Sequence, residues 1–413
     1  MENNQSKRKV QVSFLLGAGF SVPAGYPKAK ELKDQLLDFD EQNKIKFSES
    51  GVLYEDGIVI NCVNRKNYVN SYYLAFEFCK DLIHVYKEEK EFDYEEFYDF
   101  LTGGGEINSS KYMDLAKKHI QNNYRQLICD VKIVYNQMIA FLIKDKNGNQ
   151  WYGDSTHLGE VSCYENFIQF LAELLNSDII VNIHTLNHDL FFESLLKRED
   201  IVRISDGFEG YGSNYYGYLD CNDREYLCRL ERYTGNYDTN LRLYKLHGSL
   251  NYYIYYTKIN SVCCIPDRCI KLQYGIDKVY KELNNGELEI VPRSILTSFL
   301  TGKNKVYNEF FYKDLFSQFQ ENLEQSSILI IIGYSGGDPG INKYLKDYYK
   351  GGKCFIVDPA VEENSDLENS DLENSDLIDL ATSFNATTYA KGVDEFQWIQ
   401  WYENDLKKRA LLG

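Results

Sequence analysis

Short runs of apolar and β-branched residues alternate with helical patterns along much of the chain. We predict buried strands at residues 10–16, 179–183, 241–246, 252–256, 327–332 and 354–357. Helical spacing of apolar residues marks segments 27–39, 165–175, 306–323 and 394–408. Because the strands end in glycine or polar residues and alternate with helices, the pattern predicts an α/β fold: a Rossmann-like parallel sheet with helices on both faces.

The stretch between the first helix and residue 160 has a different character, because Lys, Glu, Tyr and Asn dominate it. Helical patterns at 75–86, 94–101 and 112–143 predict a helical insertion or cap. We therefore divide the chain into a Rossmann core, formed by residues 1–40 and 160–413, and a mainly helical insertion, formed by residues 41–159.

Two further stretches are predicted to lack regular structure. Residues 205–240 are rich in Gly, Tyr, Asn and Asp and are expected to form an irregular excursion. Within residues 361–378 the pentapeptide Glu-Asn-Ser-Asp-Leu occurs three times in succession. Its acidic, polar composition predicts a solvated loop, with a binding element as the alternative.

Size, charge and aromatic content limit the possible functions. The chain has 413 residues, so we expect one large domain with insertions, or two lobes. A formal net charge of −17 repels phosphate backbones and argues against direct nucleic-acid binding. An anionic dinucleotide would therefore have to be held by local backbone amides. An aromatic share of 15% suits large buried surfaces, including interfaces of a homo-oligomer.

Cysteine spacing and hydropathy indicate the cellular setting. None of the ten cysteines forms a Cys-x-x-Cys pair, so no metal is expected. Residues 1–9 are polar and basic and are not followed by an apolar signal core, and no run of about 18 apolar residues occurs. We therefore expect a cytoplasmic protein with reduced thiols and no membrane span.

The first candidate functional segment directly follows the first predicted strand. It consists of Gly17, Ala18, Gly19, Phe20 and Ser21, with Pro23, Gly25 and Pro27 after it. Glycines at this point let the backbone approach a pyrophosphate, and the following helix end supplies N–H donors. The alternative is an ordinary tight turn between strand and helix. A Walker A loop is excluded, because no Gly-Lys-Ser/Thr follows.

Two more segments place polar side chains at strand ends, where open α/β sheets bind ligands. Asn187 can donate to and accept from an amide and Asp189 offers a carboxylate, although both residue types are also good helix caps. His247 can act as a base near neutral pH or be a structural histidine. We interpret His184 as a core residue and His188 as a packing or capping residue.

The last two segments follow the final pair of long predicted strands. One contains Gly333, Tyr334 and Ser335, with Asp338 shortly after them, and the other contains Asp358. A strand-end acid of this kind often binds an adenosine ribose hydroxyl, although Asp358 is equally suited to a turn. Because all five segments fall at strand ends of one sheet, we predict that they line one crevice.

Taken together, these segments resemble the sirtuin family. Residues 17–27, GAGFSVPAGYP, resemble the sirtuin opening Gly-Ala-Gly-Ile-Ser with its downstream Gly and Pro, and residues 185–189, TLNHD, resemble Thr-Gln-Asn-Ile-Asp. His247 with the glycine after it resembles the catalytic His-Gly, and residues 333–335 resemble Gly-Thr-Ser. The order agrees across residues 17–358. The likeness is greatest to the sirtuin-like domains of bacterial antiphage-defence NADases, including those that work beside a HerA-type ATPase.

The chain departs from the sirtuin pattern at two points that affect the reaction. Cys263, Cys264 and Cys269 lack the spacing of the four-cysteine zinc module of typical sirtuins, which argues against zinc and against deacetylation. Leu186 replaces the sirtuin Gln, which removes a polar neighbour of the ribose and favours a different acceptor or plain hydrolysis.

The resemblance implies NAD as the substrate, cleaved at the bond between nicotinamide and ribose through an oxocarbenium-like state. Asn187 and Asp189 would bind the carboxamide or position water, and His247 would act as the base on a ribose hydroxyl or on the water. The residues that would hold the pyrophosphate and the adenosine side are 17–21, Gly333, Ser335 and Asp358. No Arg closely follows Asp358, which favours NAD over NADP.

An enzyme that destroyed NAD without restraint would kill its host, so we expect activity to be restrained until infection. Residues 40–150, residues 205–260 and oligomerisation are the candidate restraints, and a HerA-type ATPase is the candidate partner. The alternatives are a non-catalytic NAD or ADP-ribose sensor, a deacylase or ADP-ribosyltransferase, and an assembly subunit of an ATPase–nuclease complex.

Overall fold

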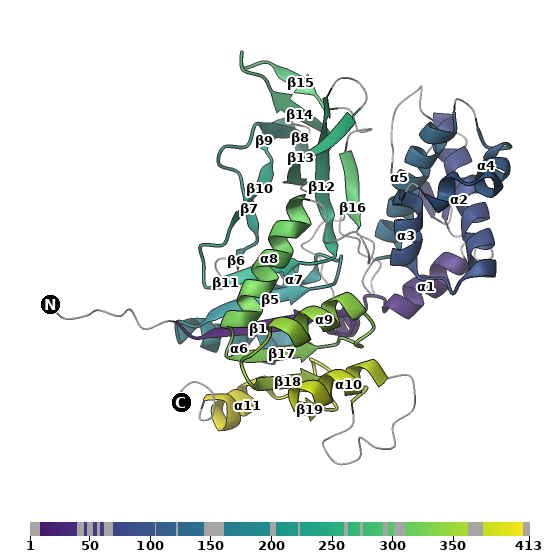
Figure 1. The fold of residues 1–413 in the computed structure, drawn as a ribbon. Coiled ribbons are helices and arrows are strands. Elements are labelled where there is room, and N and C mark those ends of the chain that lie inside the picture. Colours follow the sequence, from purple (N-terminus) through teal and green to yellow (C-terminus); the bar gives the residue numbers. More distant parts are fainter. Residues whose placement is uncertain are drawn as a thin grey trace.

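A parallel β-sheet lies at the centre of the molecule, with the helical insertion on one side and antiparallel strands at one end (Figure 1). The computed structural model describes residues 9–38, 45–47, 53–55, 58–61, 69–103, 105–120, 123–143, 161–198, 204–221, 224–259, 263–272, 276–291, 296–300, 310–361 and 375–407. The predicted α/β class with a Rossmann-like parallel sheet is confirmed.

The central sheet has seven strands in the order β19-β18-β17-β1-β5-β11-β6, and each neighbouring pair is parallel. Their bounds are β1 Gln11–Leu16, β5 Ile180–Thr185, β6 Ile204–Ser205, β11 Leu241–Lys245, β17 Ile328–Ile332, β18 Lys353–Val357 and β19 Thr387–Tyr389. On one side of β1 lie β5, β11 and β6, and on its other side lie β17, β18 and β19, which come later in the sequence. Leu16 pairs with Thr185 and with Ile332, so the carboxyl ends of these three strands are level at the switch point of the strand order.

Alternate residues of the central strands face two separate cores. In β1, Val12, Phe14 and Leu16 belong to one core and Leu15 belongs to the other. The first core includes residues of α1 (Ala29–Leu37), α6 (Glu165–Asn176), α7 (Phe191–Arg198) and α11 (Trp398–Trp401), and the second includes residues of α8 (Phe310–Gln325), α9 (Pro339–Tyr348) and α10 (Ser375–Phe384). Because helices cover both faces, β1 and β17 are buried along their whole length, and the few polar residues of β1, such as Ser13, are buried as well.

The insertion contributes to the first of these cores. Its described elements are β2 Ile45–Phe47, β3 Leu53–Glu55, β4 Ile58–Asn61, α2 Val69–Glu89, α3 Tyr94–Thr102, α4 Ser110–Ala116 and α5 Tyr124–Leu142. The helix predicted over 112–143 is two helices, because the Asn123 side chain caps α5 by accepting a hydrogen bond from Gln126 N at 2.8 Å. Apolar side chains of α2, α3 and α5 join those of β1 in one continuous core.

Apart from the small antiparallel sheet β2-β3-β4 of the insertion, antiparallel strands form two larger sheets, in the orders β16-β12-β13-β10-β7 and β15-β14-β8-β9. Their bounds are β7 Gly207–Glu209, β8 Tyr215–Cys221, β9 Arg224–Arg229, β10 Glu231–Asn236, β12 Gly248–Ile259, β13 Cys263–Lys271, β14 Ile276–Glu282, β15 Leu288–Ile290 and β16 Leu296–Leu300. The prediction that residues 205–240 are irregular was wrong, because four of these strands lie there. Nearly every residue of β9 is exposed, so its sequence lacks the alternation that marks a strand.

Two elements near the C-terminal end differ in extent from the prediction. Helix α10 begins at Ser375, inside the stretch 361–378 that was predicted to be a loop, and Leu377 of the last repeat is buried in the second core. Residues 362–374 of that stretch lie outside the described residues. The helix predicted over 394–408 begins only at Trp398 and continues as a π-helical turn over Tyr402–Leu406.

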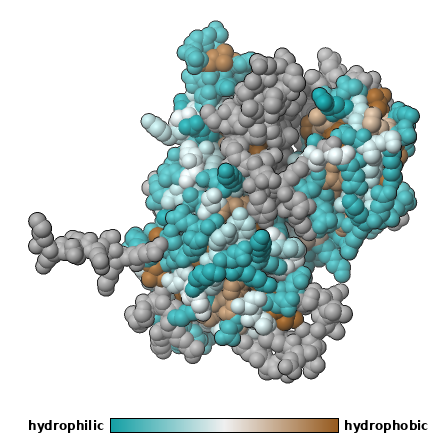
Figure 2. All heavy atoms as spheres, in the orientation of Figure 1, coloured by the Kyte–Doolittle hydropathy of each residue, from teal (hydrophilic) through white to brown (hydrophobic). Residues whose placement is uncertain are grey.

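The face of the molecule drawn in Figure 2 is mostly hydrophilic, with scattered apolar positions. The large apolar side chains that are exposed among the described residues are Met113, Tyr211, Tyr226, Leu227, Leu283 and Ile290. Across the described ranges, no helix has both the length and the hydropathy needed to cross a membrane.

Candidate active site

Two glycine-containing turns touch at the switch point, where β1 and β17 end. Gly17 N donates to Ile332 O at 3.0 Å, and Gly19 N donates to Gly333 O at 2.9 Å. Gly333 has a φ of 61°, in the left-handed region, and a Cβ at this position would lie 2.6 Å from the Cα of Gly19. Only glycine fits so close a contact between backbones. The first predicted segment and the fourth are thus joined directly.

A cavity of about 800 Å³ opens at this contact, a size typical of sites for small ligands and cofactors. Segments from the glycine turn, from α3, and from the loops that follow β5, β11, β17 and β18 line it. The predicted site residues that line the cavity are Gly17, Ala18, Gly19, Pro23, Asn187, Asp189, His247, Gly333, Tyr334, Ser335 and Asp358. Phe20 and Ser21, which were predicted with them, are not among the lining residues.

Phe20 and Ser21 support the glycine turn from behind. Phe20 is buried in the first core, with its ring 5.5 Å from that of Tyr164, and the Tyr164 hydroxyl donates to Phe20 O at 2.6 Å. Ser21 is buried as well, and its Oγ accepts a hydrogen bond from Asn187 Nδ2 at 3.2 Å. Their side chains therefore hold the turn in place and do not face the cavity.

Asn187 and Asp189 lie on the loop between β5 and α7. Asn187 Nδ2 also donates to Gly17 O at 2.9 Å, so this side chain ties the loop to the glycine turn. Asp189 Oδ1 accepts a hydrogen bond from Phe191 N at 3.0 Å, an Asx turn that satisfies the first backbone N–H of α7. Both residues also line the cavity, so support of the loop and contact with a ligand are compatible.

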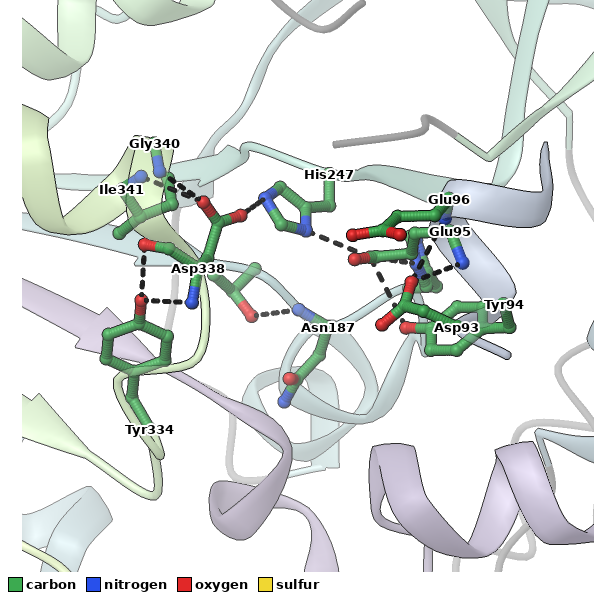
Figure 3. Close-up of polar contacts among 12 residues, drawn as sticks. Asp93, Tyr94, Glu95, Glu96, Asn187, His247, Tyr334, Asp338, Gly340 and Ile341 are labelled. Carbon is green, nitrogen blue, oxygen red and sulfur yellow. Dashed lines mark hydrogen bonds and ion pairs between the residues drawn. The ribbon is translucent and has the colours of Figure 1, made fainter. Parts of the chain in front are cut away.

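His247 lies between two carboxylates that come from distant parts of the chain (Figure 3). Its Nδ1 is 3.1 Å from Glu95 Oε1, and its Nε2 is 3.1 Å from Asp338 Oδ2. Glu95 belongs to the first turn of α3 in the insertion, and Asp338 is the N-cap of α9. All three side chains are buried and line the cavity. The insertion therefore supplies part of the site.

The charges in this cluster stabilise one another. Burial alone would lower the pKa of His247, but Glu95 and Asp338 outweigh it and raise the pKa to about 10. Burial would raise the pKa of Glu95, but His247 and His188 hold it well below its usual range. The pKa of Asp338 is also lowered, because its bonds to His247 and to Ile341 N outweigh its burial. At neutral pH the ring is therefore an imidazolium that donates from both nitrogens.

The two other histidines of this region have different surroundings. His184 is buried against Tyr244 and is bonded through Nδ1 to Phe14 O at 3.0 Å, and burial lowers its pKa to about 3. It is a neutral core residue, as we interpreted it from the sequence. His188 lines the cavity, and its Nε2 is 3.5 Å from Glu95 Oε1. Within the described part of the chain, neither ring nitrogen of His188 forms a hydrogen bond.

The loops after β17 and β18 complete the lining. The Tyr334 hydroxyl donates to Asn342 Oδ1 at 2.9 Å and accepts from Asp338 N at 3.1 Å, which fixes the loop that carries Asp338. The Asp338 carboxylate accepts two hydrogen bonds, at 2.8 and 3.0 Å, from backbone N–H groups of the first turn of α9. Asp358 accepts a hydrogen bond from Ala360 N at 2.8 Å, and burial raises its pKa. It is a turn residue that also lines the cavity.

Glu95 and His188 were given no role in the site from the sequence, and Asp338 was included in the fourth segment without a function of its own. Asp338 precedes Pro339 at the junction of a predicted strand and helix, so its capping role was visible in the sequence. Glu95 lies in the acid-rich stretch 91–96, where nothing distinguishes it from solvated acids. Its place in the site depends on the contact between the first turn of α3 and His247, which follows β11.

No group of three or more His, Cys, Asp or Glu side chains among the described residues is arranged to hold a metal ion. The polar side chains that line the cavity carry amide, carboxylate, imidazole, hydroxyl and ammonium groups. Such groups can bind a polar ligand, orient water and transfer protons.

No protein-family model and no curated protein matches the chain. Similar solved structures include a mutant Sir2 homologue in complex with 2′-O-acetyl ADP ribose, at 12% identity and a TM-score of 0.36, covering 98% of this chain and 96% of that one. Another is Sir2Tm bound to a propionylated peptide, at 14% identity and a TM-score of 0.32, covering 96% and 93%. At such values the fold assignment rests on the strand order, which defines a Rossmann-like α/β protein with a ligand-sized cavity at its switch point.

Proposed function

We propose that this protein is an NAD glycohydrolase, which cleaves NAD to nicotinamide and ADP-ribose. The observation that carries the proposal is the convergence of residues 17–19, Asn187, His247 and Gly333 around one cavity. These are residues of the four motifs through which the sequence resembles sirtuins. The cavity also lies at the carboxyl edge of a parallel sheet, where Rossmann-like folds bind dinucleotides.

Binding of the dinucleotide would use both sides of the switch point. Residues 17–19 present backbone and one methyl group to the cavity, so a pyrophosphate can approach closely. Lys28 also lines the cavity and supplies local positive charge in a chain of net charge −17. On the other side, Gly333, Ser335 and Asp358 would hold the adenosine, with the Asp358 carboxylate accepting from a ribose hydroxyl.

Cleavage would break the bond between nicotinamide and C1′ of the ribose. Asn187 and Asp189 would bind the carboxamide or position the water. His247 in its neutral form would accept a proton from a ribose hydroxyl or from the water as the water oxygen bonds to C1′ and nicotinamide leaves as a neutral molecule. In the structure Nε2 of His247 pairs with Asp338, so the hydroxyl or water would take the place of this carboxylate.

The proposal is tested by following nicotinamide release from NAD by chromatography and NAD binding by calorimetry. The wild-type protein should bind and cleave NAD. His247→Asn should bind NAD but cleave it at least about 10²-fold more slowly, because a general base contributes on the order of 10²–10⁴ to the rate. Wild-type protein that binds NAD between pH 6 and pH 10 without releasing nicotinamide would refute the enzymatic role.

We further propose that the activity serves cytoplasmic antiphage defence and is restrained until infection, in a homo-oligomer or beside a HerA-type ATPase. The support is the resemblance to defence NADases and the toxicity of unrestrained NAD loss. NAD consumption should be slow for the chain alone and fast with its partner during infection. Equal, full activity of the chain in both settings would contradict the restraint.

The double pairing of His247 favours a second candidate function, that of a non-catalytic sensor of NAD or ADP-ribose. An imidazole that donates from both nitrogens has no lone pair with which to act as a base. For a sensor, His247→Asn should leave the biological response intact. Loss of the response in a variant that still binds NAD would exclude the sensor.

A further inference from the structure

The first turn of α3 carries Glu95 to the cavity and is held there from two sides. Asp93 caps the helix, because its carboxylate accepts from Glu95 N and Glu96 N, each at 3.0 Å. From α5, the hydroxyl of buried Tyr135 donates to Tyr94 O at 2.8 Å. The backbone at Glu95 is thus fixed by hydrogen bonds within the insertion, and its side chain is the part that meets the sheet.

Glu95 is a buried carboxylate whose described partners are ring groups. Its Oε1 is 3.1 Å from His247 Nδ1, 3.5 Å from His188 Nε2 and 3.3 Å from the Tyr94 hydroxyl. The side chain is 9% exposed, and an uncompensated charge at such a site costs several kcal/mol. The imidazolium of His247 therefore compensates the buried charge of Glu95, and breaking the contact between Glu95 and Nδ1 would cost much of this stabilisation.

Asp338, on the opposite side of the ring, differs in this respect. Its Oδ1 accepts the two backbone hydrogen bonds that cap α9, whereas Oδ2 is the atom that meets His247, so the cap does not involve the histidine. The contact between Asp338 Oδ2 and His247 Nε2 can therefore be exchanged for another partner at lower cost than the contact with Glu95. Both carboxylates line the cavity, so a ligand group can reach this side of the ring.

We propose that Glu95 is a positioning residue for His247, which holds Nδ1 and controls the proton on the ring while Nε2 is the nitrogen that meets the substrate. This inference rests on the proposed function. It makes the insertion part of the active site, because α3 supplies the partner that orients the base. Carboxylate–imidazole pairs fix the orientation of catalytic histidines in the same way.

Among the described residues, the charged and titratable groups in direct contact with His247 or Glu95 include Asp338 before α9, His188 after β5 and Tyr94 on α3. Replacing Glu95 with Gln removes one negative charge 3.1 Å from Nδ1 and keeps the shape of the side chain. An opposite charge at this range changes a pKa by about one to three units. The pKa of His247 should therefore fall from about 10 toward neutrality in Glu95→Gln.

The first measurement does not depend on activity. The protein has six histidines, and NMR of ¹⁵N-histidine-labelled wild type and His247→Asn assigns the His247 ring. Its titration midpoint should be lower in Glu95→Gln than in wild type by about one to three pH units. Glu96→Gln removes an exposed carboxylate one position further along the same helix and should leave the midpoint unchanged. Equal midpoints in Glu95→Gln and Glu96→Gln would overturn the proposal.

The second measurement is the pH profile of nicotinamide release. The rate should rise with pH as His247 loses its proton, and in Glu95→Gln this rise should lie at lower pH. On the plateau, where the ring is neutral in both proteins, Glu95→Gln should be about 10²-fold slower, because the ring has lost its orienting partner. If the pH profile of Glu95→Gln had the same midpoint and the same plateau rate as that of the wild type, the positioning role would be overturned. If the wild type released no nicotinamide, the proposed function would fail, and the NMR titration would still decide whether Glu95 controls the ring.

Discussion

Replacement of Gly333 by Ala tests the backbone contact on which the cavity is built. Two costs add at this position. An alanine in the left-handed region costs about 1–2 kcal/mol. Its methyl group would also lie 2.6 Å from Gly19 Cα and closer still to Phe20 N, and overpacking of this kind typically costs about 1–3 kcal/mol. Because both neighbours are backbone atoms, no side chain can move aside, and we expect a total loss of about 2–5 kcal/mol.

Gly352→Ala is the matched control for this substitution. Gly352 also has a positive φ, 76°, but no heavy atom lies within 4 Å of the position that its Cβ would take. Gly352→Ala should therefore lose only the cost of placing an alanine in the left-handed region, about 1–2 kcal/mol of the free energy of unfolding. Urea unfolding followed by tryptophan fluorescence measures both losses, and calorimetry measures NAD affinity, which should fall for Gly333→Ala alone. Equal losses of stability in the two variants would refute the close contact between the glycine turns.

Two further substitutions test the contacts behind the site. The pKa of His247 is raised from 6.5 to about 10, so the folded protein binds this proton more tightly than the unfolded chain does. The proton therefore stabilises the folded state. This contribution to the free energy of unfolding is complete below pH 6.5 and is lost as the pH rises toward 10. One pKa unit corresponds to about 1.36 kcal/mol, so urea unfolding of the wild type should show a loss on the order of 5 kcal/mol over that pH range. The loss should be smaller in Glu95→Gln. Equal losses in the two proteins would contradict the interaction between Glu95 and His247. Tyr164→Phe removes the hydrogen bond to buried Phe20 O and should lower the free energy of unfolding by about 1–3 kcal/mol, and a loss below about 0.5 kcal/mol would show that the bond contributes little.

The elements that were predicted correctly are those that can be identified from the residues of the element itself. Each strand of the central sheet that was predicted from its apolar residues is present, because helices cover both faces and these residues are buried in two cores. The glycine turn and the polar loops were identified as candidate site segments because they lie at strand ends. In the structure Asn187 and His247 line one cavity together with Gly17 and Gly333. Phe20 was assigned to the site because it belongs to the glycine segment 17–21, but its ring packs in the core.

The parts that were missed depend on contacts between distant segments. β9 is exposed along nearly its whole length, and it is a strand because β8 pairs with it, not because of its own pattern. Glu95 is 152 residues from His247 in the sequence, and it meets this histidine because the first turn of α3 lies against the loop after β11. Local sequence distinguishes neither case from solvated surface. The start of α10 at Ser375 was missed for the same reason, because Leu377 is buried only in the context of the second core.

The order of strands in the sheet also determines when a growing polypeptide can acquire the cavity. The first strand must remain without its neighbour on one side until residues 328–332 have been synthesised, more than 300 residues later. Gly333 follows directly and Asp358 later still, so no shorter nascent chain can form the complete cavity. Translation itself therefore delays the appearance of the complete cavity, and ribosome-bound fragments that end before Gly333 should be inert toward NAD.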